Sequence, residues 1–278
     1  MHSYLLAVLF ALASALTIAW GTVVRHRIVE NAPAGSSPIL VAMRRPLWWA
    51  GMSTAIIAYV LQVVALGFGP LLIVQPVLVM SLMFTLPLSA VYEGRRISRR
   101  ETFWSAALTV AVTAIVLVGR PVGGEDHPPL ERWIPALTVG VIVLVAMDRF
   151  ARRQIRRERA LIQGLVTGAV FGYVAVLSKA VADVFVESGF IGLLTNWEVY
   201  GLTLAATLGT WVQQNAFNAG ALRNSLPAMK IAEPIVAFTL GYLVLFERFQ
   251  VDGWEWLIFG AAFAMMIAST VVLSRINI

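Results

Sequence analysis

The chain has 278 residues, of which 59% are hydrophobic and 13% are charged, and its mean hydropathy is +0.80. This composition is typical of a polytopic membrane protein and leaves no room for a sizeable soluble domain. Cysteine is absent, which excludes disulfides and thiolate metal sites. The net charge of +6 does not indicate nucleic-acid binding, because the arginines all fall in loops or at predicted helix ends, where they set membrane topology.

Nine apolar runs are long enough to cross a bilayer, since about 20 helical residues span roughly 30 Å of hydrocarbon. They lie near residues 3–24, 47–68, 70–92, 102–120, 132–149, 160–183, 196–218, 222–246 and 253–274. No basic region precedes the first run, so we expect it to be retained as a helix rather than cleaved as a signal peptide. The sequence thus predicts an all-α membrane protein with about nine transmembrane helices. Turn residues at 67–70 and 218–220 predict two tight hairpins.

The arginines predict the orientation of the chain. If the runs alternate in direction, 16 of the 19 arginines fall on one side, and Arg120, Arg132 and Arg248 fall on the other. Cytoplasmic loops carry the excess of basic residues, so the side with 16 is expected to be cytoplasmic. The prediction is a multi-pass protein of the cell (inner) membrane with its N-terminus outside and its C-terminus cytoplasmic.

The two halves of the chain resemble each other. Residues 84–93 (FTLPLSAVYE) align with residues 238–247 (FTLGYLVLFE) at an offset of 154, and Glu101 aligns with Glu255. An offset of 151 pairs Gln62 with Gln213, Ala65 with Ala216, Gly69 with Gly220 and Pro76 with Pro227. We therefore predict a first four-helix repeat over 1–121, a linking helix and cytoplasmic basic loop over 122–159, and a second four-helix repeat over 160–278. The single linking helix inverts the second copy, and inverted repeats recur among secondary transporters.

Residues 233–248 (EPIVAFTLGYLVLFER) resemble the closing signature of EamA-like members of the drug/metabolite transporter (DMT) superfamily. In that signature a Glu-Pro and a Gly precede a Gly-Glu-Arg turn, and here Phe246 replaces the last glycine. In the first half, Gln75-Pro76 and Glu93-Gly94-Arg95 stand where the signature would be. The resemblance covers essentially the whole chain and implies transport of a small solute. The superfamily usually has ten helices, and a count of nine is more similar to its NIPA-like branch, which is associated with magnesium transport.

Both lysines of the chain fall inside apolar runs. Lys230 and Glu233 are three residues apart, so they share one helix face. Counting from residue 222 places them roughly 12 and 16 Å along the helix, near the midplane. A charge in hydrocarbon costs about 3 kcal/mol or more, which makes this pair a candidate substrate-binding site. The alternative is a structural pair, with Glu233 bracing the helix at Pro234.

Lys179 and Asp183 form a second pair, four residues apart near the outer end of the run 160–183. We expect Lys179 to snorkel towards the lipid headgroups. The alternative is an outer gate in which this pair engages Glu247 or Asp252. Three glycines at a spacing of four in the same run, Gly164, Gly168 and Gly172, predict close helix packing.

Amide side chains lie in otherwise apolar runs on both halves. They either hydrogen-bond neighbouring helices or line a polar cavity with Lys230 and Glu233. In the second case the substrate-binding residues are Lys230, Glu233, Gln62, Gln213 and Asn218, and the gate or secondary polar residues are Lys179, Asp183, Gln214 and Gln75. The candidate hinges are Pro76, Pro227 and Pro234, because proline removes a backbone hydrogen bond from a helix.

These observations predict an integral membrane secondary transporter of the DMT/EamA type that moves a small metabolite or drug-like solute by alternating access. No phosphate-binding loop, nucleophile elbow or metalloprotease motif appears, so we expect no enzyme activity, no cofactor and no metal site. The expected partners are the solute, a proton or cation, and the lipid bilayer, in a monomer or homodimer. One alternative is a NIPA-like magnesium or divalent-cation transporter, which Lys230 disfavours by repelling a cation. The other is a non-transporting membrane scaffold.

Overall fold

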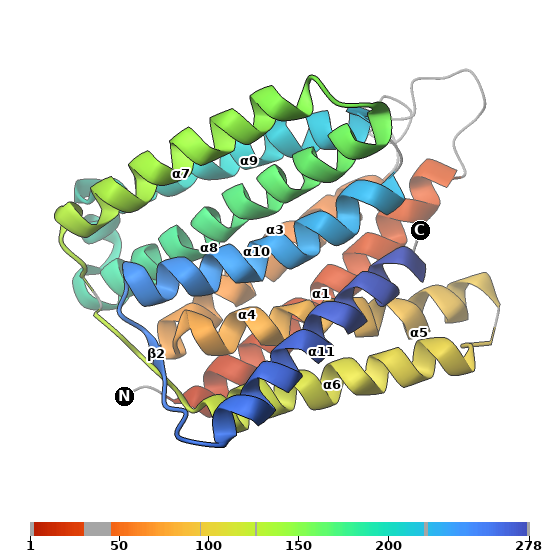
Figure 1. The fold of residues 1–278 in the computed structure, drawn as a ribbon, viewed down its shortest axis with the longest axis horizontal. Helices are drawn as coiled ribbons and strands as arrows, with labels where there is room; N and C mark the ends of the chain where they lie inside the picture. The colour runs from red at the N-terminus through yellow and green to blue at the C-terminus, as the bar shows by residue number, and fades with distance from the viewer. Residues whose placement is uncertain (1–2, 31–45, 95, 126, 220–221, 277–278) are drawn as a thin grey trace.

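The computed structural model describes residues 3–30, 46–94, 96–125, 127–219 and 222–276 as an elongated bundle of helices that lie side by side (Figure 1). The helices are α1 (Tyr4–Glu30), α3 (Pro46–Phe68), α4 (Leu71–Val79), α5 (Ser81–Glu93), α6 (Arg99–Gly119), α7 (Leu130–Ala151), α8 (Arg156–Thr195), α9 (Trp197–Ala219), α10 (Leu222–Leu243) and α11 (Glu255–Ile276). Two short strands, β1 (Pro121–Val122) and β2 (Arg248–Phe249), pair antiparallel.

The predicted all-α fold is confirmed, and each predicted run coincides with helical residues. Seven helical segments of the described chain are long and apolar enough to cross a membrane: Tyr4–Val24, Leu71–Val91, Arg99–Gly119, Leu130–Ala151, Glu158–Thr195, Ser225–Leu243 and Glu255–Ile276. In α3 the described apolar stretch is shorter, Ser53–Phe68, and α9 is not among the seven. The count of nine spans therefore stays a prediction.

Local backbone features set the helix ends. The third run is divided at Met80 into α4 and α5, and α5 ends at Gly94, whose φ of 65° is the left-handed conformation that glycine adopts readily. Ser98 and Glu101 form a capping box that starts α6. At the start of α11, the Asp252 N–H donates to the Glu255 carboxylate at 3.4 Å. The expected end of the sixth run at residue 183 was wrong, because α8 continues to Thr195 through a kink at Gly189.

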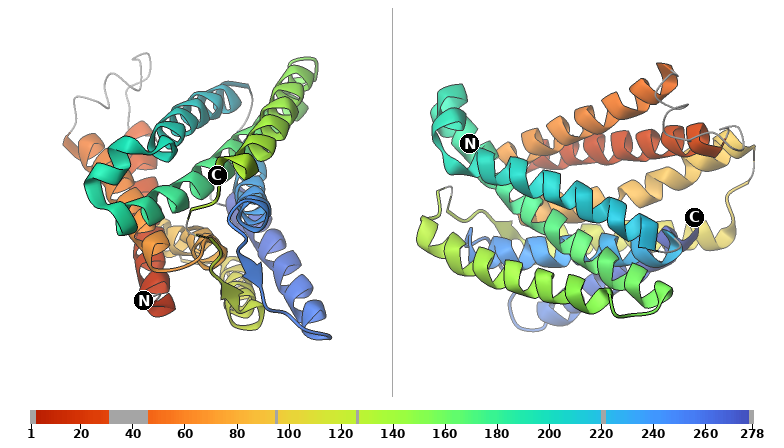
Figure 2. Two further views of the ribbon diagram at one scale, coloured as in Figure 1. Left: turned by 90° about the vertical axis from the view of Figure 1, so that its left-hand side faces the viewer. Right: turned by 90° about the horizontal axis from the view of Figure 1, so that it is seen from above.

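Small residues allow some of the helices to approach closely. Figure 2 shows the arrangement of the helices from two further sides. A Cβ atom at Gly168 of α8 would lie 2.3 Å from the Met229 carbonyl oxygen of α10, so the close packing predicted for the glycine series is confirmed. In α1, the alanines at a spacing of four that are fully buried are Ala7, Ala11, Ala15 and Ala19. Within each half, the first helix packs on the second, α1 on α3 and α8 on α9, while α6 packs on α11.

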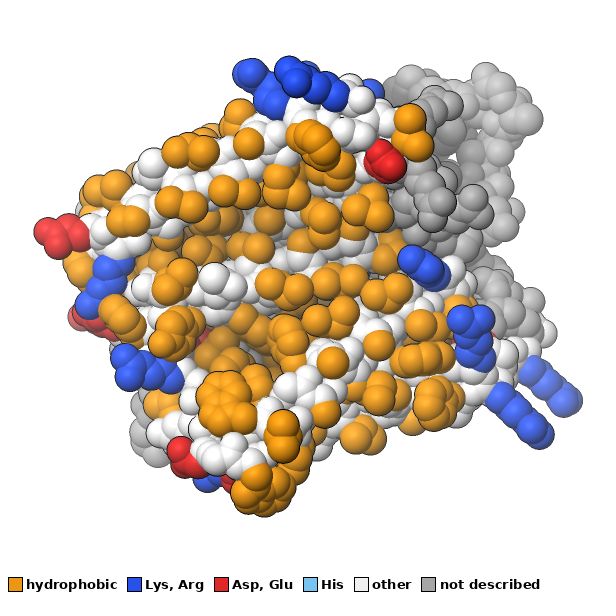
Figure 3. All heavy atoms as spheres, in the orientation of Figure 1, with side chains coloured by type: hydrophobic (Ala, Val, Ile, Leu, Met, Phe, Trp, Pro, Cys, Tyr) orange, Lys and Arg blue, Asp and Glu red, His pale blue; other side chains and the backbone are white. Residues whose placement is uncertain are grey.

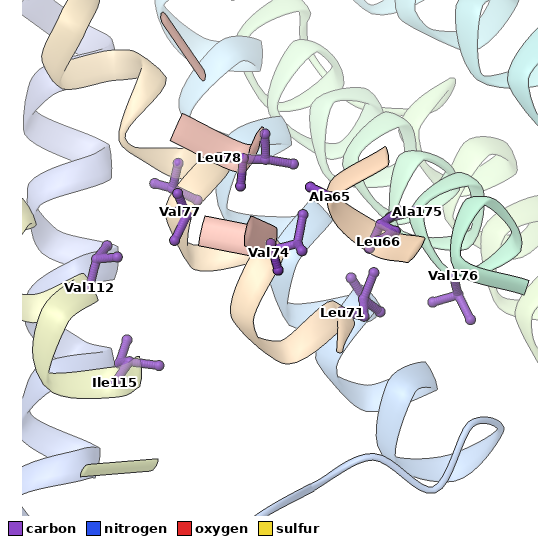
Figure 4. Close-up of a cluster of buried hydrophobic side chains, with 14 of the residues drawn as sticks. Ala65, Leu66, Leu71, Val74, Val77, Leu78, Val112, Ile115, Ala175 and Val176 are labelled. Atoms are coloured by element: carbon purple, nitrogen blue, oxygen red, sulfur yellow. The ribbon is translucent and has the colours of Figure 1, made fainter. Parts of the chain in front are cut away.

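α4 occupies the centre of the bundle, and all nine of its residues are buried. Figure 4 shows Val74, Val77 and Leu78 between side chains of α3, α6 and α8. Val112 and Ile115 pack from α6. Because the core meets at this one short helix, the position of α4 affects both halves of the chain.

The face of the bundle shown in Figure 3 is apolar over most of its length. α7 buries only Trp133 and Ala151 of its 22 residues, and exposes Val139, Val141 and Ile142 by 58–64%. Water would not stabilise such a helix, whereas the hydrocarbon of a bilayer would. The apolar surface therefore indicates a membrane-embedded protein.

Charged residues gather at the two ends of the bundle (Figure 3). One end, here called the sheet end, holds β1, β2 and the turn between α3 and α4. The opposite end, here called the basic end, carries exposed arginines at the ends of α5, α7 and α11 and the starts of α6 and α8: Arg96, Arg99, Arg100, Arg149, Arg152, Arg153, Arg159 and Arg275. This distribution separates the charges as the sequence predicted.

Replacing Gly168 with alanine should destabilise the protein by about 1–3 kcal/mol, because the added methyl group forces α8 away from the α10 backbone. Unfolding in detergent micelles, followed by circular dichroism, measures the change. The control is Gly260→Ala in α11, where a Cβ meets no atom within 4 Å. That change should leave stability unchanged or raise it by about 0.5–1 kcal/mol, since alanine favours helix. Equal effects of the two substitutions would contradict the close packing.

Candidate functional site

Glu247 lies in the turn after α10, and its side chain binds the start of α4. The Oε1 atom accepts a hydrogen bond from the Leu71 N–H at 2.8 Å, and Oε2 accepts one from the Leu72 N–H at 2.9 Å. The first N–H groups of a helix have no partner within that helix, and Pro70 at the N-cap makes no side-chain cap. Glu247 supplies this cap from the other half of the chain, and is itself only 1% exposed. It therefore holds the two halves together at the sheet end.

The turn that carries Glu247 is fixed by backbone contacts. Phe246 adopts a positive φ of 55°, and the Glu247 N–H donates to the Gly241 carbonyl oxygen at 3.0 Å. The Leu245 carbonyl oxygen accepts a hydrogen bond from the Glu125 N–H at 2.7 Å. The chain is thus reversed after α10 and turned back towards α4.

Lys179 and Asp183 lie one turn apart on α8 and form an ion pair inside the bundle. The Lys179 Nζ atom lies 2.5 Å from Asp183 Oδ1 and also donates to the Leu66 carbonyl oxygen of α3 at 3.0 Å. Their side chains are 7% and 6% exposed. The snorkelling interpretation of Lys179 is therefore wrong, since its ammonium group points into the protein.

Lys179, Asp183 and Glu247 form one electrostatic unit, here called the buried ionic cluster. Both α8 residues act on the Glu247 carboxylate, Lys179 by attraction and Asp183 by repulsion. Burial raises the pKa of Glu247 to about 7, because loss of water outweighs the two backbone donors and the Lys179 charge. The cluster connects α3, α4 and α8 to the turn after α10.

Further contacts close the sheet end around this cluster. Ion pairs join Arg120 to Glu255, Arg132 to Glu125 and His127 to Glu187. The Arg132 guanidinium also lies 4.0 Å from the centre of the Phe246 ring. In the strand pair, Pro121 is opposite Phe249 and Val122 is opposite Arg248. These contacts tie the residues between α6 and α7 to α8, to α11 and to the turn after α10.

Lys230 and Glu233 are half-buried on α10. Within the described part of the chain, no ion pair of 4.0 Å or less joins them to each other or to another residue. The Gln213 amide of α9 lies 3.5 Å from the Met229 sulfur, so the structure brings Gln213 beside the residue that precedes Lys230. In this region the polar groups of Lys230, Glu233 and Gln213 therefore do not satisfy one another's hydrogen-bonding and charge requirements.

The remaining predicted residues are dispersed. Gln62 lines a half-open pocket between α1 and α3, which also contains Thr17, Thr54 and Tyr59. The cavity volume is about 160 Å³, below the roughly 300–1,000 Å³ of typical small-molecule sites. Among the described residues, no other predicted site residue lines this pocket, although the Tyr59 hydroxyl lies 2.8 Å from the Ser178 hydroxyl, next to Lys179.

Gln75 and Gln214 have opposite environments. Gln75 is 2% exposed in α4 and its amide nitrogen has no described partner, whereas Gln214 is exposed on α9. The Asn218 side chain lies outside the described part of the chain. The three candidate hinges are within helices, Pro76 in α4 and Pro227 and Pro234 in α10.

The sequence did not predict the role of Glu247 as the cap of α4. It identified Glu247 as part of the family-like signature and as a possible partner of Lys179. The missing information was the distance in space between residues 71 and 247, which no local pattern contains. A buried start of α4 at Pro70, without a capping side chain nearby, was the available signal that an acceptor had to come from elsewhere.

The fold and these buried charges define an all-α protein embedded in a membrane. No protein-family model and no solved structure matches the chain. The chain is 63% identical to the "Uncharacterized protein Cgl0250/cg0304" of Corynebacterium glutamicum (strain ATCC 13032), over 99% of this chain and 96% of that protein. It therefore belongs to the same family as Cgl0250/cg0304.

Replacing Asp183 with asparagine should destabilise the protein by about 3–5 kcal/mol, because the buried Lys179 ammonium would lose the carboxylate with which it is directly paired. The double change Lys179→Met and Asp183→Leu should cost less than the single change, since both charges are removed together. Denaturant unfolding in micelles measures both.

The matched control is Asp148→Asn, which breaks the i,i+4 pair of Asp148 with Arg152. That pair is on the surface, with side chains 30% and 58% exposed, so its loss should change stability by no more than about 1 kcal/mol. If Asp183→Asn has no larger effect than the control, Lys179 and Asp183 are not a buried pair.

Proposed function

We propose that this protein is a secondary transporter of the DMT type, which moves a small metabolite or drug-like solute across the cell membrane by alternating access. The observation that carries the proposal is the buried ionic cluster, which joins the two halves at one end of an apolar bundle. Ionisable groups inside membrane proteins are costly and usually mark solute or ion pathways. Because the contact between the two halves of the chain depends on charged groups, it is suited to the opening and closing of the sheet end.

An inverted repeat of four helices is part of this proposal. The packing of α1 on α3 has its counterpart in α8 on α9, and α6 packs on α11, the last helix of each proposed repeat. Leu71 begins α4, and residue Leu222, at the offset of 151, begins α10. The capping box of Ser98 and Glu101 likewise stands 154 residues before Asp252 and Glu255. These correspondences support nine spans around a linking helix, α7.

Lys230 and Glu233 are the proposed solute-binding charges. They belong to the spanning segment Ser225–Leu243, yet both are partly exposed. Charged side chains at this depth are tolerated where they face a water-filled cavity. A solute with an anionic or carbonyl group would bind Lys230, and a cationic or hydrogen-bond-donating group would bind Glu233, with Gln213 beside them. A zwitterion fulfils both requirements.

A magnesium transporter of the NIPA-like kind is the second candidate. Magnesium prefers oxygen ligands, usually one or two carboxylates together with retained waters. Among the described residues, no group of three or more His, Asp and Glu side chains is placed to hold a metal ion. Glu233 next to Lys230 is a poor cation site, so we favour the organic solute.

Binding of a solute should raise the melting temperature of the purified protein by mass action. We expect an increase of several degrees with a zwitterionic or anionic metabolite, and its loss in both Lys230→Ala and Glu233→Gln. The control variant is Arg120→Ala, which removes a charge at the sheet end and should keep the increase. An increase with magnesium alone that survives Lys230→Ala would favour the cation transporter. If solute uptake into proteoliposomes is unchanged when Lys230→Ala and Glu233→Gln are combined, Lys230 and Glu233 are not the solute-binding charges.

The proposed orientation places the sheet end outside and the basic end in the cytoplasm. Because the chain contains no cysteine, a single introduced thiol reports its side without background. In intact cells, Gly123→Cys should react with a membrane-impermeant thiol reagent, while Arg153→Cys should react only after the cells are permeabilised. Both positions are exposed. The reverse result would overturn the orientation.

A further inference from the structure

With all three groups ionised, the buried ionic cluster contains two negative charges, on Asp183 and Glu247, and one positive charge, on Lys179. Lys179 is engaged by Asp183 at 2.5 Å, so its charge is shared with one carboxylate already. Glu247 adds a second carboxylate, 1% exposed, that contacts backbone N–H groups rather than a cationic side chain. Helix N-terminal dipoles stabilise an anion only partly. One cation of single charge would therefore balance the charges of the cluster.

The other elements around Glu247 supply no further cation in the described chain. α4 has no ionisable side chain between Leu71 and Val79, and the last turn of α3 has none. From the segment before α7, Glu125 approaches the turn, but its carboxylate is paired with Arg132. On the turn itself, Arg248 and Asp252 are exposed to solvent. The charged side chains that act on Glu247 are thus Lys179 and Asp183, which offset each other.

A proton fits this site better than a metal ion. Each Glu247 oxygen already accepts a backbone hydrogen bond, and the ammonium group of Lys179 would repel a metal cation. A hydrated sodium ion requires several oxygen ligands and space, whereas a proton requires one oxygen atom. The carboxylate is enclosed by protein, since Glu247 is 1% exposed and a Cβ on Gly241 would already be in van der Waals contact with Glu247 Oε2 at 3.7 Å and with a Leu71 methyl group at 3.4 Å.

We propose that Glu247 is a proton-binding site, which takes up one proton when the sheet end closes and releases it when that end opens. This inference rests on the proposed function, and it assigns the proton as the ion coupled to movement of the sheet end. Closure transfers the carboxyl group from water to a buried position beside Asp183, and both changes favour its neutral form. Protonation removes the excess negative charge, so the closed end is electrically balanced.

The direction of the pH dependence follows from linkage. The pKa of Glu247 is about 7 in the closed structure, and in water a glutamate carboxyl has a pKa near 4.5. Between these two values the closed state holds the proton and the open state does not. Acidification in this range therefore favours closure, and opening increases by up to about tenfold for each unit of rising pH. Above pH 7 both states are ionised, and the dependence ends.

A single thiol introduced near the buried ionic cluster measures how readily the sheet end opens. Ala65 lies on α3 next to Leu66 and is fully buried, so Ala65→Cys reacts with an impermeant thiol reagent only when the sheet end opens. The full-length protein is reconstituted in vesicles and labelled from the outside between pH 5 and 8. Thiols become more reactive as pH rises, so each rate is divided by that of Gly123→Cys, an exposed position at the same end.

We expect the normalised labelling rate of Ala65→Cys to rise at least tenfold from pH 5 to pH 7 and to level off above pH 7. Adding Glu247→Gln, which resembles the protonated carboxyl group, should hold the rate at its low value throughout. Adding Glu255→Gln, at a half-buried carboxylate of the same end that pairs with Arg120, should leave the rise intact.

A flat profile with native Glu247 would overturn the proton site, even if Glu247→Gln failed to fold. So would a rise that persists in Glu247→Gln. Replacing sodium with choline at constant pH should not change the rate, and a change would assign the site to sodium instead. The result is separate from that of the proposed function, because labelling requires no solute. A Glu247-dependent rise without transport of any solute would contradict the transporter alone.

Discussion

The start of α4 requires hydrogen-bond acceptors inside an apolar bundle, and much of the structure depends on how this requirement is met. Backbone N–H groups that are buried without partners destabilise a protein, and in a membrane water cannot replace them. Helix α4 starts after Pro70 with all nine of its residues buried. Glu247 supplies both acceptors from the second half of the chain. The cap therefore fixes the central helix relative to the end of α10.

A carboxylate brought into this position affects the charges around it. Lys179 and Asp183 lie on α8, and the Lys179 ammonium also binds the carbonyl of Leu66, near the end of α3. The cap, the ion pair and the end of α3 are consequently coupled, so that moving one exposes charges on the others. In the proposed transporter such a unit would open or close as a whole, which is the behaviour expected of a bistable contact.

The sequence predicted the helices well because hydropathy over a window of about 20 residues reports a local property. It did not predict the division at Met80, where an apolar run continues without Gly or a charge, or the continuation of α8 past Asp183 to Thr195. The burial of Lys179 was missed for a different reason. Snorkelling and pairing with a buried acid have the same sequence pattern, and the Leu66 carbonyl that decides between them lies 113 residues away. The sequence identifies which residues are able to make contacts across the bundle. It does not give the distances between them in space.

The two lysine pairs differ in a way that matches two different tasks. Lys179 and Asp183 are buried and bound to each other, so they stabilise one arrangement of helices. Lys230 and Glu233 are half-buried and share a helix face without an ion pair among the described residues, so their charges can act on another molecule. The Gln213 amide near Met229 adds a polar group beside the second pair. Binding and closure would thus be carried by separate charges on neighbouring helices, α10 and α8, which pack along Gly164, Gly168 and Gly172.

The proposed inverted repeat gives the contact at the sheet end a sequence counterpart at the basic end. Glu93 stands 154 residues before Glu247, and Leu222, which begins α10, stands 151 residues after Leu71, which begins α4. In an inverted repeat these counterparts belong to the opposite side of the membrane. The Glu247 cap of α4 then belongs to one side of the membrane only, that of the sheet end.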